Sequence, residues 1–373
     1  MSDVAIGLGR TARSAWSLDD ISIVPTRRTR DADVVDISWE VEAFRLELPF
    51  LAGPLDAVVS PTSAVTIDRL GGVAVLDLEG LWARHDDAQG IIDRVADADD
   101  ATALTILRDA METPIDPDLV GQRIKELRAA GVVSAGAVTP QRTIDLAEVI
   151  VAAELDLLLL SGTVVSAEHV TDDEREPLNL KTFVRRFDVP VIVGGCTSYR
   201  SALHLMRTGA AGVLVGGAAT SDAVNAEVLG IGLPQATAIA DVRAARMRHL
   251  EETGVEVQII ASGPLRTGGD IAKAIACGAD AVMLGPPLAA ATDAPGRGAL
   301  WGQGAVHRRL GRGGVEHRET VGTIEEILVG PATDQDGATN LFGALRATMA
   351  MTGLRSLTEL HKADLVVRPG GAR

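Results

Sequence analysis

Eight short apolar runs recur along this chain of 373 residues, and helical patterns separate them. The runs lack regular polar alternation, which is typical of strands buried on both faces of a parallel sheet. Several of the helical patterns end in glycine, as helices commonly do. This unbroken alternation predicts a closed (β/α)8 barrel, with an open doubly wound sheet as the alternative. The predicted strands are Phe50–Gly53, Gly72–Leu78, Val132–Val138, Leu155–Leu160, Val189–Val193, Gly212–Val215, Val257–Ala261 and Ala281–Leu284.

The other segments fit around one barrel, so we expect a single domain over residues 1–373, with the barrel at about 49–290. An N-terminal extension of little periodicity precedes it. Three helical patterns predict a small helical insertion at about 79–131. Glycine and arginine dominate Gly296–Gly314, which predicts a mobile loop. A C-terminal helical tail, at about 315–373, includes an amphipathic helix at Asn340–Thr352 that should pack on the barrel wall.

The amino-acid composition of the chain limits the kinds of molecule that it is expected to bind. A formal net charge of −16 and 3% aromatic residues argue against nucleic-acid binding, which needs a positive face and stacking side chains. No apolar run approaches the roughly 20 residues of a membrane helix. Residues 1–13 lack the apolar core of a signal peptide, so we expect a cytoplasmic protein. The two cysteines, Cys196 and Cys277, form neither a disulfide framework nor a zinc-ligand pattern, so no metal site is expected.

The stretch Val257–Ala289 carries the clearest sign of a binding site. It reads as strand, Gly-rich turn, helix, strand and Gly-rich turn, and its strands lead into Gly263 and Gly285. In a (β/α)8 barrel the loops after the last two strands commonly bind phosphate, because glycine lets backbone N–H groups approach an anion. We therefore expect a phosphorylated ligand where Leu55, Ser221, Gly263 and Gly285 converge. The alternative is that both glycines merely turn the chain.

Four segments, in order, resemble the IMP dehydrogenase and GMP reductase superfamily: WSLDDISIVP from Trp16, LPFLAGPLDAVV from Leu48, LRTGGDIAKAIACGADAVMLG from Leu265, and LFGALRATMAMTGLRSLTEL from Leu341. The sequence is most similar to the short actinobacterial and cyanobacterial branch. That branch lacks the paired cystathionine-β-synthase-type regulatory modules, and the segment at 79–131 is too short to hold them. The resemblance implies a purine nucleoside monophosphate substrate, NAD or NADP as cofactor, and a homo-oligomer, a tetramer in the family.

The resemblance also implies which residues would contact the nucleotide. They follow the carboxyl ends of the predicted strands, where barrel enzymes carry their sites. These residues are Gly53, Leu55, Gly216, Gly217, Ser221, Ser262, Gly263, Leu284 and Gly285.

One departure from the family concerns its nucleophile. Family members use a cysteine after strand six, whose thiolate attacks C2 of the purine before hydride moves to or from a nicotinamide. Counting back from Leu233–Thr237 places Ala223 at that position, and a methyl group cannot form the bond. The family's next threonine falls on Asn225. Cys196, at the carboxyl end of strand five, is a weak candidate for a replacement, because no partner base adjoins it in sequence.

Further departures weaken the predicted nucleotide contacts. The family's ribose-binding aspartate falls on Ser262, the glycine after it on Pro264, and a phosphate-loop serine on Pro286. Each lost charge-assisted bond costs about 1.5–3 kcal/mol, and proline removes a backbone donor. Two hypotheses follow: a purine nucleotide oxidoreductase with impaired catalysis, or a non-catalytic nucleotide-binding or regulatory relative of the full-length enzyme. A flavin-phosphate barrel would share the phosphate loops but none of the four motifs.

Overall fold

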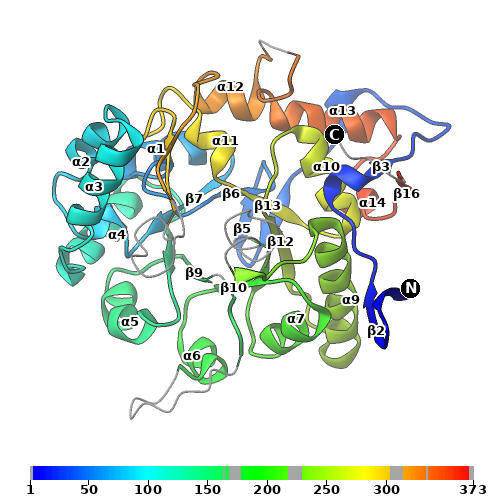
Figure 1. Ribbon diagram of the computed structural model, residues 1–373, viewed down its shortest axis with the longest axis horizontal. Helices are drawn as coiled ribbons and strands as arrows, with labels where there is room; N and C mark the ends of the chain where they lie inside the picture. The colour runs from blue at the N-terminus through cyan, green and yellow to red at the C-terminus, as the bar shows by residue number, and fades with distance from the viewer. Residues whose placement is uncertain are drawn as a thin grey trace.

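The computed structural model describes residues 3–162, 164–167, 178–216, 229–302, 314–332 and 335–368. Eight parallel strands close into a barrel in which β13 pairs with β6, so the open-sheet alternative is wrong and the predicted (β/α)8 barrel is confirmed (Figure 1). All eight predicted strands are present. They are β6 (Phe50–Ala52), β7 (Val73–Asp77), β8 (Ala135–Val138), β9 (Leu157–Ser161), β10 (Val191–Cys196), β11 (Gly212–Gly216), β12 (Gln258–Ser262) and β13 (Ala281–Leu284).

Helices surround the barrel, and side-chain caps fix where several of them begin. Ser60, Ser198 and Thr267 each accept a backbone N–H from the first turn of the helix that follows, which satisfies a donor that the helix itself cannot pair. The helices between the strands are α1 (Pro61–Arg69), α5 (Thr143–Ala152), α6 (Leu180–Arg186), α7 (Tyr199–Met206), α9 (Gln235–Thr253), α10 (Gly268–Cys277) and the short α11 (Pro286–Ala289).

The predicted insertion between strands β7 and β8 consists of a 3-10 turn, η3 (Leu81–Ala83), and three helices, each with an aspartate at its N-cap. These helices lie together at one side of the barrel (Figure 1). The insertion is therefore positioned beside the ends of β6 and β7. Its helices are α2 (Ala88–Ala96), α3 (Asp100–Ala110) and α4 (Pro117–Ala129).

The C-terminal tail packs on the barrel through α13 (Leu341–Met351), as its amphipathic pattern predicts. Phe342 is buried against Phe50 of β6, with ring centroids 5.3 Å apart. Two shorter helices, α12 (Ile324–Val329) and α14 (Leu357–Leu360), flank α13 along the chain.

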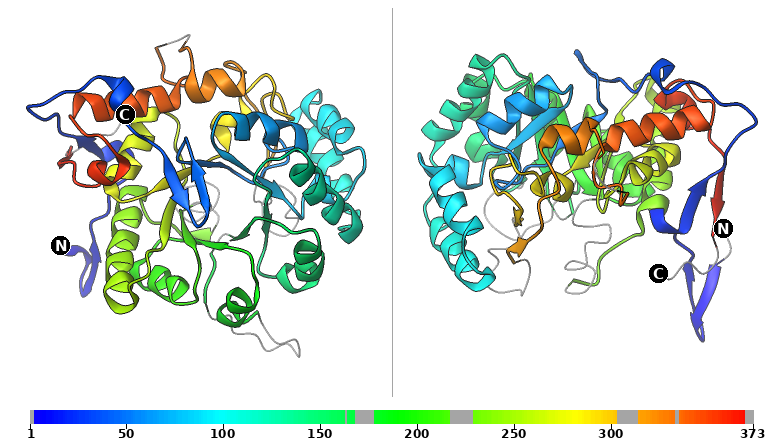
Figure 2. Two further views of the ribbon diagram at one scale, coloured as in Figure 1. Left: turned by 180° about the vertical axis from the view of Figure 1, so that it is seen from behind. Right: turned by 90° about the horizontal axis from the view of Figure 1, so that it is seen from above.

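The terminal segments form small two-stranded sheets that the sequence analysis missed (Figure 2). One of them, β4–β5, is anchored to the amino end of the barrel, because Trp39 donates its indole N–H to the Gln258 side chain at the start of β12, at 2.8 Å. The sheets are β1 (Asp3–Gly7) with β2 (Arg10–Arg13), β3 (Ile21–Ile23) with β16 (Leu365–Val367), and β4 (Trp39–Val41) with β5 (Phe44–Leu46).

The loop predicted from Gly296 to Gly314 begins with ordered structure instead. β14 (Ala299–Leu300) pairs antiparallel with β15 (Glu316–His317), and the side chains of Ala299 and Trp301 are buried. Residues 303–313 lie outside the described residues. Among those described, no helix is long and apolar enough to cross a membrane.

Candidate functional site

The carboxyl ends of β6 and β13 bring several predicted contact residues together. The Gly53 N–H donates to the Leu284 carbonyl at 2.7 Å, which joins the two strand ends. A Cβ built on Gly285 would lie 2.8 Å from Cδ1 of Leu55, so the Leu55 side chain lies directly over that glycine. Gly53, Leu55, Leu284 and Gly285 therefore share one patch of the rim.

The ends of β11 and β12 continue this patch. Gly216, whose φ of 100° favours glycine, lies opposite Ser262, and Ser262 lies opposite Met283 of β13. Gly263 follows Ser262 directly. The predicted residues Gly217, Ser221 and Ala223, like Asn225, lie outside the described residues. The structure places Leu55 against Gly285 and Gly263 just after the neighbouring strand β12, and a shared ligand site with Ser221 stays a prediction.

A buried amide also lies at this side of the rim. Gln235, at the start of α9, donates its Nε2–H to the Ser262 carbonyl at 3.1 Å. Its Oε1 atom is buried and has no hydrogen-bond partner within the part of the chain that the structure describes. The sequence analysis did not single out Gln235, because nothing in the pattern shows that its side chain would be enclosed.

The turn after β13 offers an anion few backbone donors. Pro286 and Pro287, the first residues of α11, have no N–H. Leu288 and Ala289 both donate their N–H groups to the Gly285 carbonyl, each at 3.0 Å. The first two residues of this short helix thus have no N–H, and the next two donate within the turn, so these four residues offer a phosphate no backbone donor.

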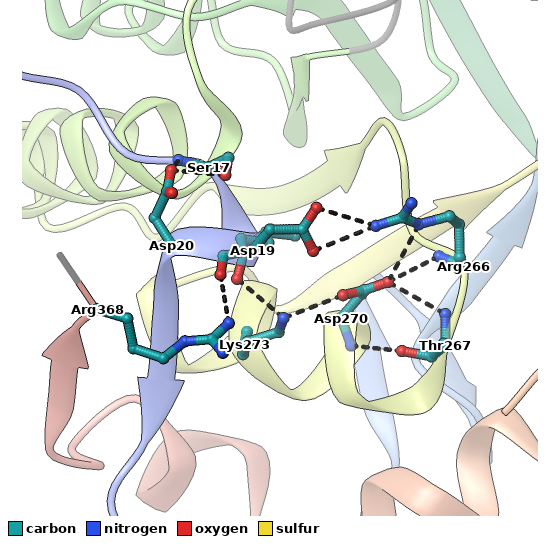
Figure 3. Close-up of polar contacts among 9 residues, drawn as sticks. Ser17, Asp19, Asp20, Arg266, Thr267, Asp270, Lys273 and Arg368 are labelled. Atoms are coloured by element: carbon teal, nitrogen blue, oxygen red, sulfur yellow. Dashed lines mark hydrogen bonds and ion pairs between the residues drawn. The ribbon is translucent and has the colours of Figure 1, made fainter. Parts of the chain in front are cut away.

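Backbone donors of the turn after β12 are used by the carboxylate of Asp270. Pro264 has no N–H, and Leu265 donates to the Gly263 carbonyl at 2.7 Å. Figure 3 shows Oδ2 of Asp270 accepting the N–H groups of Arg266 and Thr267, at 3.1 and 3.2 Å.

Asp270 is 5% exposed and is held by a further cation. Its other carboxylate oxygen lies 3.1 Å from Nζ of Lys273, which also donates to the Leu18 carbonyl at 2.9 Å (Figure 3). An internal anion thus occupies the positive amino end of α10, where an external phosphate would otherwise be favoured.

Neither cysteine of the chain offers a thiolate. Cys196 is the last residue of β10, is 2% exposed, and burial raises the pKa of its thiol to about 12. Cys277 lies in α10, and burial raises the pKa of its thiol to about 12 despite the nearby Arg243 and Lys273 cations. Because thiolate is the nucleophilic form, both are inert near neutral pH.

The β6–β7 half of the rim carries a buried acid that the sequence analysis passed over. Asp56, 6% exposed, accepts the Leu81 N–H through Oδ2 at 3.0 Å, while its Oδ1 has no well-formed hydrogen bond among the described residues. Burial raises the pKa of this carboxyl to about 6, against the lowering effects of the Leu81 and Trp82 N–H groups, the Arg84 cation and the Trp301 side chain. A Cβ on Gly80 would lie 2.2 Å from Oδ1, so the carboxylate fits only because residue 80 is glycine.

A small cleft opens beside Asp56, between the rim and the insertion. Its volume of about 20 Å³ holds one or two water molecules, so as it stands it does not fit a nicotinamide ring. No group of His, Cys, Asp and Glu side chains among the described residues could hold a metal ion. The cleft is lined by Pro54, Leu55, Asp56, Asp77, Leu107, Met111, Trp301 and Gly302.

Comparisons with known proteins show which family the chain belongs to. Residues 15–372 match the family model described as the IMP dehydrogenase / GMP reductase domain. The chain belongs to the IMP dehydrogenase / GMP reductase family. In keeping with its oxidoreductase members, it is 47% identical over 374 residues to an uncharacterized oxidoreductase of Mycolicibacterium smegmatis, covering 98% of this chain and 99% of that protein.

Two further relatives differ in how similar they are to this chain. A crystal structure of an IMP dehydrogenase/GMP reductase-like protein from Corynebacterium glutamicum has a TM-score of 0.92 and 43% identity, covering 98% of this chain and 97% of that one. The inosine-5'-monophosphate dehydrogenase of Methanocaldococcus jannaschii is 24% identical over 475 residues, covering 96% of this chain and 94% of that enzyme. This alignment is longer than the present 373 residues, consistent with a short branch without the regulatory modules.

Proposed function

We propose that this chain is a purine-nucleotide-binding member of the IMP dehydrogenase / GMP reductase family whose turnover of IMP or GMP is very weak. The observation that supports the proposal is that the chain has no thiol suited to act as the nucleophile. The sequence has only Cys196 and Cys277, both are buried with raised pKa values, and Ala223 stands where the family places its cysteine. The covalent step at purine C2 then has no nucleophile.

The proposed ligand is a purine nucleoside monophosphate, IMP or GMP, and its proposed contacts are the residues gathered at the carboxyl ends of β6, β11, β12 and β13. We expect weak binding, because Ser262 replaces a carboxylate acceptor and the turns after β12 and β13 use their donors internally. The family's cofactor, NAD or NADP, would supply or accept hydride. The cleft at β6–β7 does not fit it, so we assign it no residues.

A second candidate is a non-catalytic regulatory relative that acts on a full-length family enzyme. The observation that favours it is the same pair of closed turns, since they remove phosphate contacts as well as the nucleophile. Because the two candidates differ in turnover rather than in fold, binding and catalysis must be measured separately. We propose that either form works in the cytoplasm as a homo-oligomer.

The test is calorimetric titration of the purified full chain with IMP, GMP, NAD and NADPH, first singly and then as the pairs IMP with NAD and GMP with NADPH, which contain the hydride acceptor or donor that each conversion needs. Binding of IMP or GMP without change of the nucleotide supports the first candidate. Absence of heat with every purine ligand, together with saturable binding to a full-length family enzyme, supports the second. Tight binding followed by conversion of IMP or GMP contradicts both.

A further inference from the structure

A basic face lies on the outer wall of the barrel, on helices α6 and α7. Between Leu178 and Gly209 the sequence has five lysine and arginine residues and one acid, Asp188, although the whole chain has a formal net charge of −16. A local excess of positive charge on an acidic protein favours contact with an anionic partner. The five cations are all exposed, and they are Lys181, Arg185, Arg186, Arg200 and Arg207.

The two helices lie next to each other, so their cations belong to one surface. Figure 1 shows α7 beside α6 along the barrel wall, and a Cβ built on Gly209, just after α7, would lie 3.8 Å from Cγ1 of Val184 in α6. Lys181 and Arg185 are four residues apart, which places them on one side of α6. Packed helices lie about 8–10 Å apart, so one extended partner can contact Arg200 of α7 as well as these two.

The charge of this face is not neutralised within the described part of the chain. No described residue forms a hydrogen bond or ion pair with the side chain of Lys181, Arg185 or Arg200. Arg207 differs, because it pairs with Glu252 of α9 at 2.8 Å. Arg248 binds the same carboxylate at 2.7 Å, so this acid of the neighbouring helix is already used.

Helix dipoles do not account for the cations at the amino ends of these helices. Lys181 and Arg200 both lie in the first turn, two residues after the N-cap. The amino end of a helix is positive, so a cation there is unfavourable, whereas Arg185 and Arg186 in the last turn of α6 offset the dipole. The charges of Lys181 and Arg200 therefore do not stabilise the fold in this way, and they are available to an external anion.

An aromatic side chain beside these cations favours a polypeptide as the partner. Tyr199 is the single tyrosine of the chain, begins α7 next to Arg200, and is 37% exposed. Tyrosine and arginine are the side chains enriched where proteins contact each other. A nucleic acid instead needs positive charge along an extended groove, and this face is limited to two short helices of an acidic chain.

We propose that this α6–α7 face binds an acidic polypeptide segment of another protein, with Lys181, Arg185 and Arg200 pairing with its carboxylates and Tyr199 in contact beside them. Such a segment is complementary to the face in charge, and charge complementarity also excludes basic partners. The inference goes beyond the proposed function, because it uses no residue of the nucleotide rim and stands whether or not the rim binds a nucleotide.

The first test measures the fluorescence anisotropy of a labelled peptide of about twelve glutamates mixed with the full chain, at about 20 mM and about 150 mM salt. We expect saturable binding that weakens with salt, and Lys181→Glu/Arg185→Glu/Arg200→Glu should weaken it at least about tenfold. The matched control, Arg27→Glu/Arg94→Glu/Lys125→Glu, changes the net charge equally at exposed cations elsewhere and should weaken binding less than about threefold. No binding by the unmodified chain, or equal losses in both variants, overturns the proposal.

A milder variant guards against damage to the fold. Lys181→Gln/Arg200→Gln removes two charges without adding acids, so its urea-unfolding midpoint should match that of the unmodified protein while its peptide affinity falls. An unchanged affinity in this variant overturns the proposal.

The second test separates the acidic segment from other occupants of the face. Saturating IMP should not displace the peptide, an oligonucleotide of equal charge should bind more weakly, and light scattering should give equal masses for the unmodified and triply substituted proteins. Displacement by IMP, tighter binding of the oligonucleotide, or a lower mass of the substituted protein each overturns the proposal. The face would then serve a nucleotide, a nucleic acid or a second copy of the chain, respectively.

Discussion

On the β12–β13 side of the rim the chain's own groups use backbone donors, whereas the adjoining β6–β7 side buries a carboxylate with incomplete hydrogen bonding. Asp270 accepts the N–H groups of Arg266 and Thr267, and Gly285 accepts two more from α11. On the adjoining strands β6 and β7, the Asp56 carboxylate is enclosed beside Gly80, and its Oδ1 has no well-formed hydrogen bond among the described residues. The donors named in the turns after β12 and β13 are paired internally, whereas buried acceptors with incomplete hydrogen bonding remain at Asp56 and, beside Ser262, at Gln235.

This difference gives two separate places at which the proposed weakness of nucleotide binding and turnover can be tested. A phosphate gains little at turns whose donors are already paired, because it must first break the existing bonds. Burying a carboxylate whose hydrogen bonding is incomplete is costly, which is why the pKa of Asp56 is raised. The predictions below test each half in turn.

The largest effect on IMP affinity is expected when hydrogen-bonding groups are restored in the turns after β12 and β13. Ser262→Asp restores an acceptor for the ribose hydroxyls, and Pro264→Gly with Pro286→Ser restores backbone donors. If each change recovers a charge-assisted bond of about 1.5–3 kcal/mol, the combined protein should bind IMP at least about 10²-fold more tightly. Calorimetry with IMP measures the gain.

Inosine, which has the ribose but no phosphate, is the matched ligand for that comparison. We expect the gain from Ser262→Asp to persist with inosine and the gain from Pro286→Ser to vanish. An unchanged IMP affinity in the combined variant would show that closed turns are not what limits binding.

The next effect is the pH dependence that Asp56 imposes on stability. Its folded pKa of about 6 lies above the unfolded value of about 3.9, so its stabilising contribution is complete below about pH 4 and is lost as the pH rises through about 6. The difference corresponds to about 3 kcal/mol in the free energy of unfolding. Asp56→Asn keeps an acceptor for the Leu81 N–H and should flatten the urea-unfolding profile over this range. Equal slopes in the two proteins would contradict the assignment.

A comparable or smaller effect is expected at the glycine that makes room for this acid. Gly80→Ala places a Cβ against Oδ1 of Asp56 and should lower the free energy of unfolding by about 1–3 kcal/mol. Gly302→Ala is the control, because a Cβ there meets no atom within 4 Å. Similar urea midpoints for both variants would mean that the Asp56 carboxylate moves aside without cost.

The smallest effect is expected at the surface of the closed half. Arg266 pairs with Asp19 through side chains that are 66% and 64% exposed, so water screens the attraction. Arg266→Ala should change the free energy of unfolding by less than about 1 kcal/mol, because the backbone N–H that Asp270 accepts is retained. A loss of several kcal/mol in urea unfolding would show that the guanidinium, not the backbone, closes the turn.

Much of the fold could be predicted from the sequence, because parallel strands buried on both faces and amphipathic helices leave a strong pattern. The place of Asp270 at the start of a helix, and the absence of backbone N–H groups at Pro264 and Pro286, can also be predicted from the residue types. The hairpins β1–β2 and β4–β5 were missed, since strands of three to five residues carry too little periodicity.

The burial of Oδ1 of Asp56 and of Oε1 of Gln235 could not be predicted from the sequence. Their burial depends on how loops after different strands pack together, and no local pattern records such packing. Asp56 lies within the family-like segment after the first strand, which is the one signal that could have drawn attention to it.

Turnover by the unmodified chain tests the central claim most directly. NADH formation from IMP and NADPH consumption with GMP should both be undetectable, since loss of a nucleophile can cost about 10⁶ in turnover. Cys196→Ala, measured in parallel, should behave identically because that thiol is buried in β10. Robust conversion of either nucleotide by the unmodified protein, abolished by Cys196→Ala, would show that the nucleophile has moved to strand five and that this account is wrong.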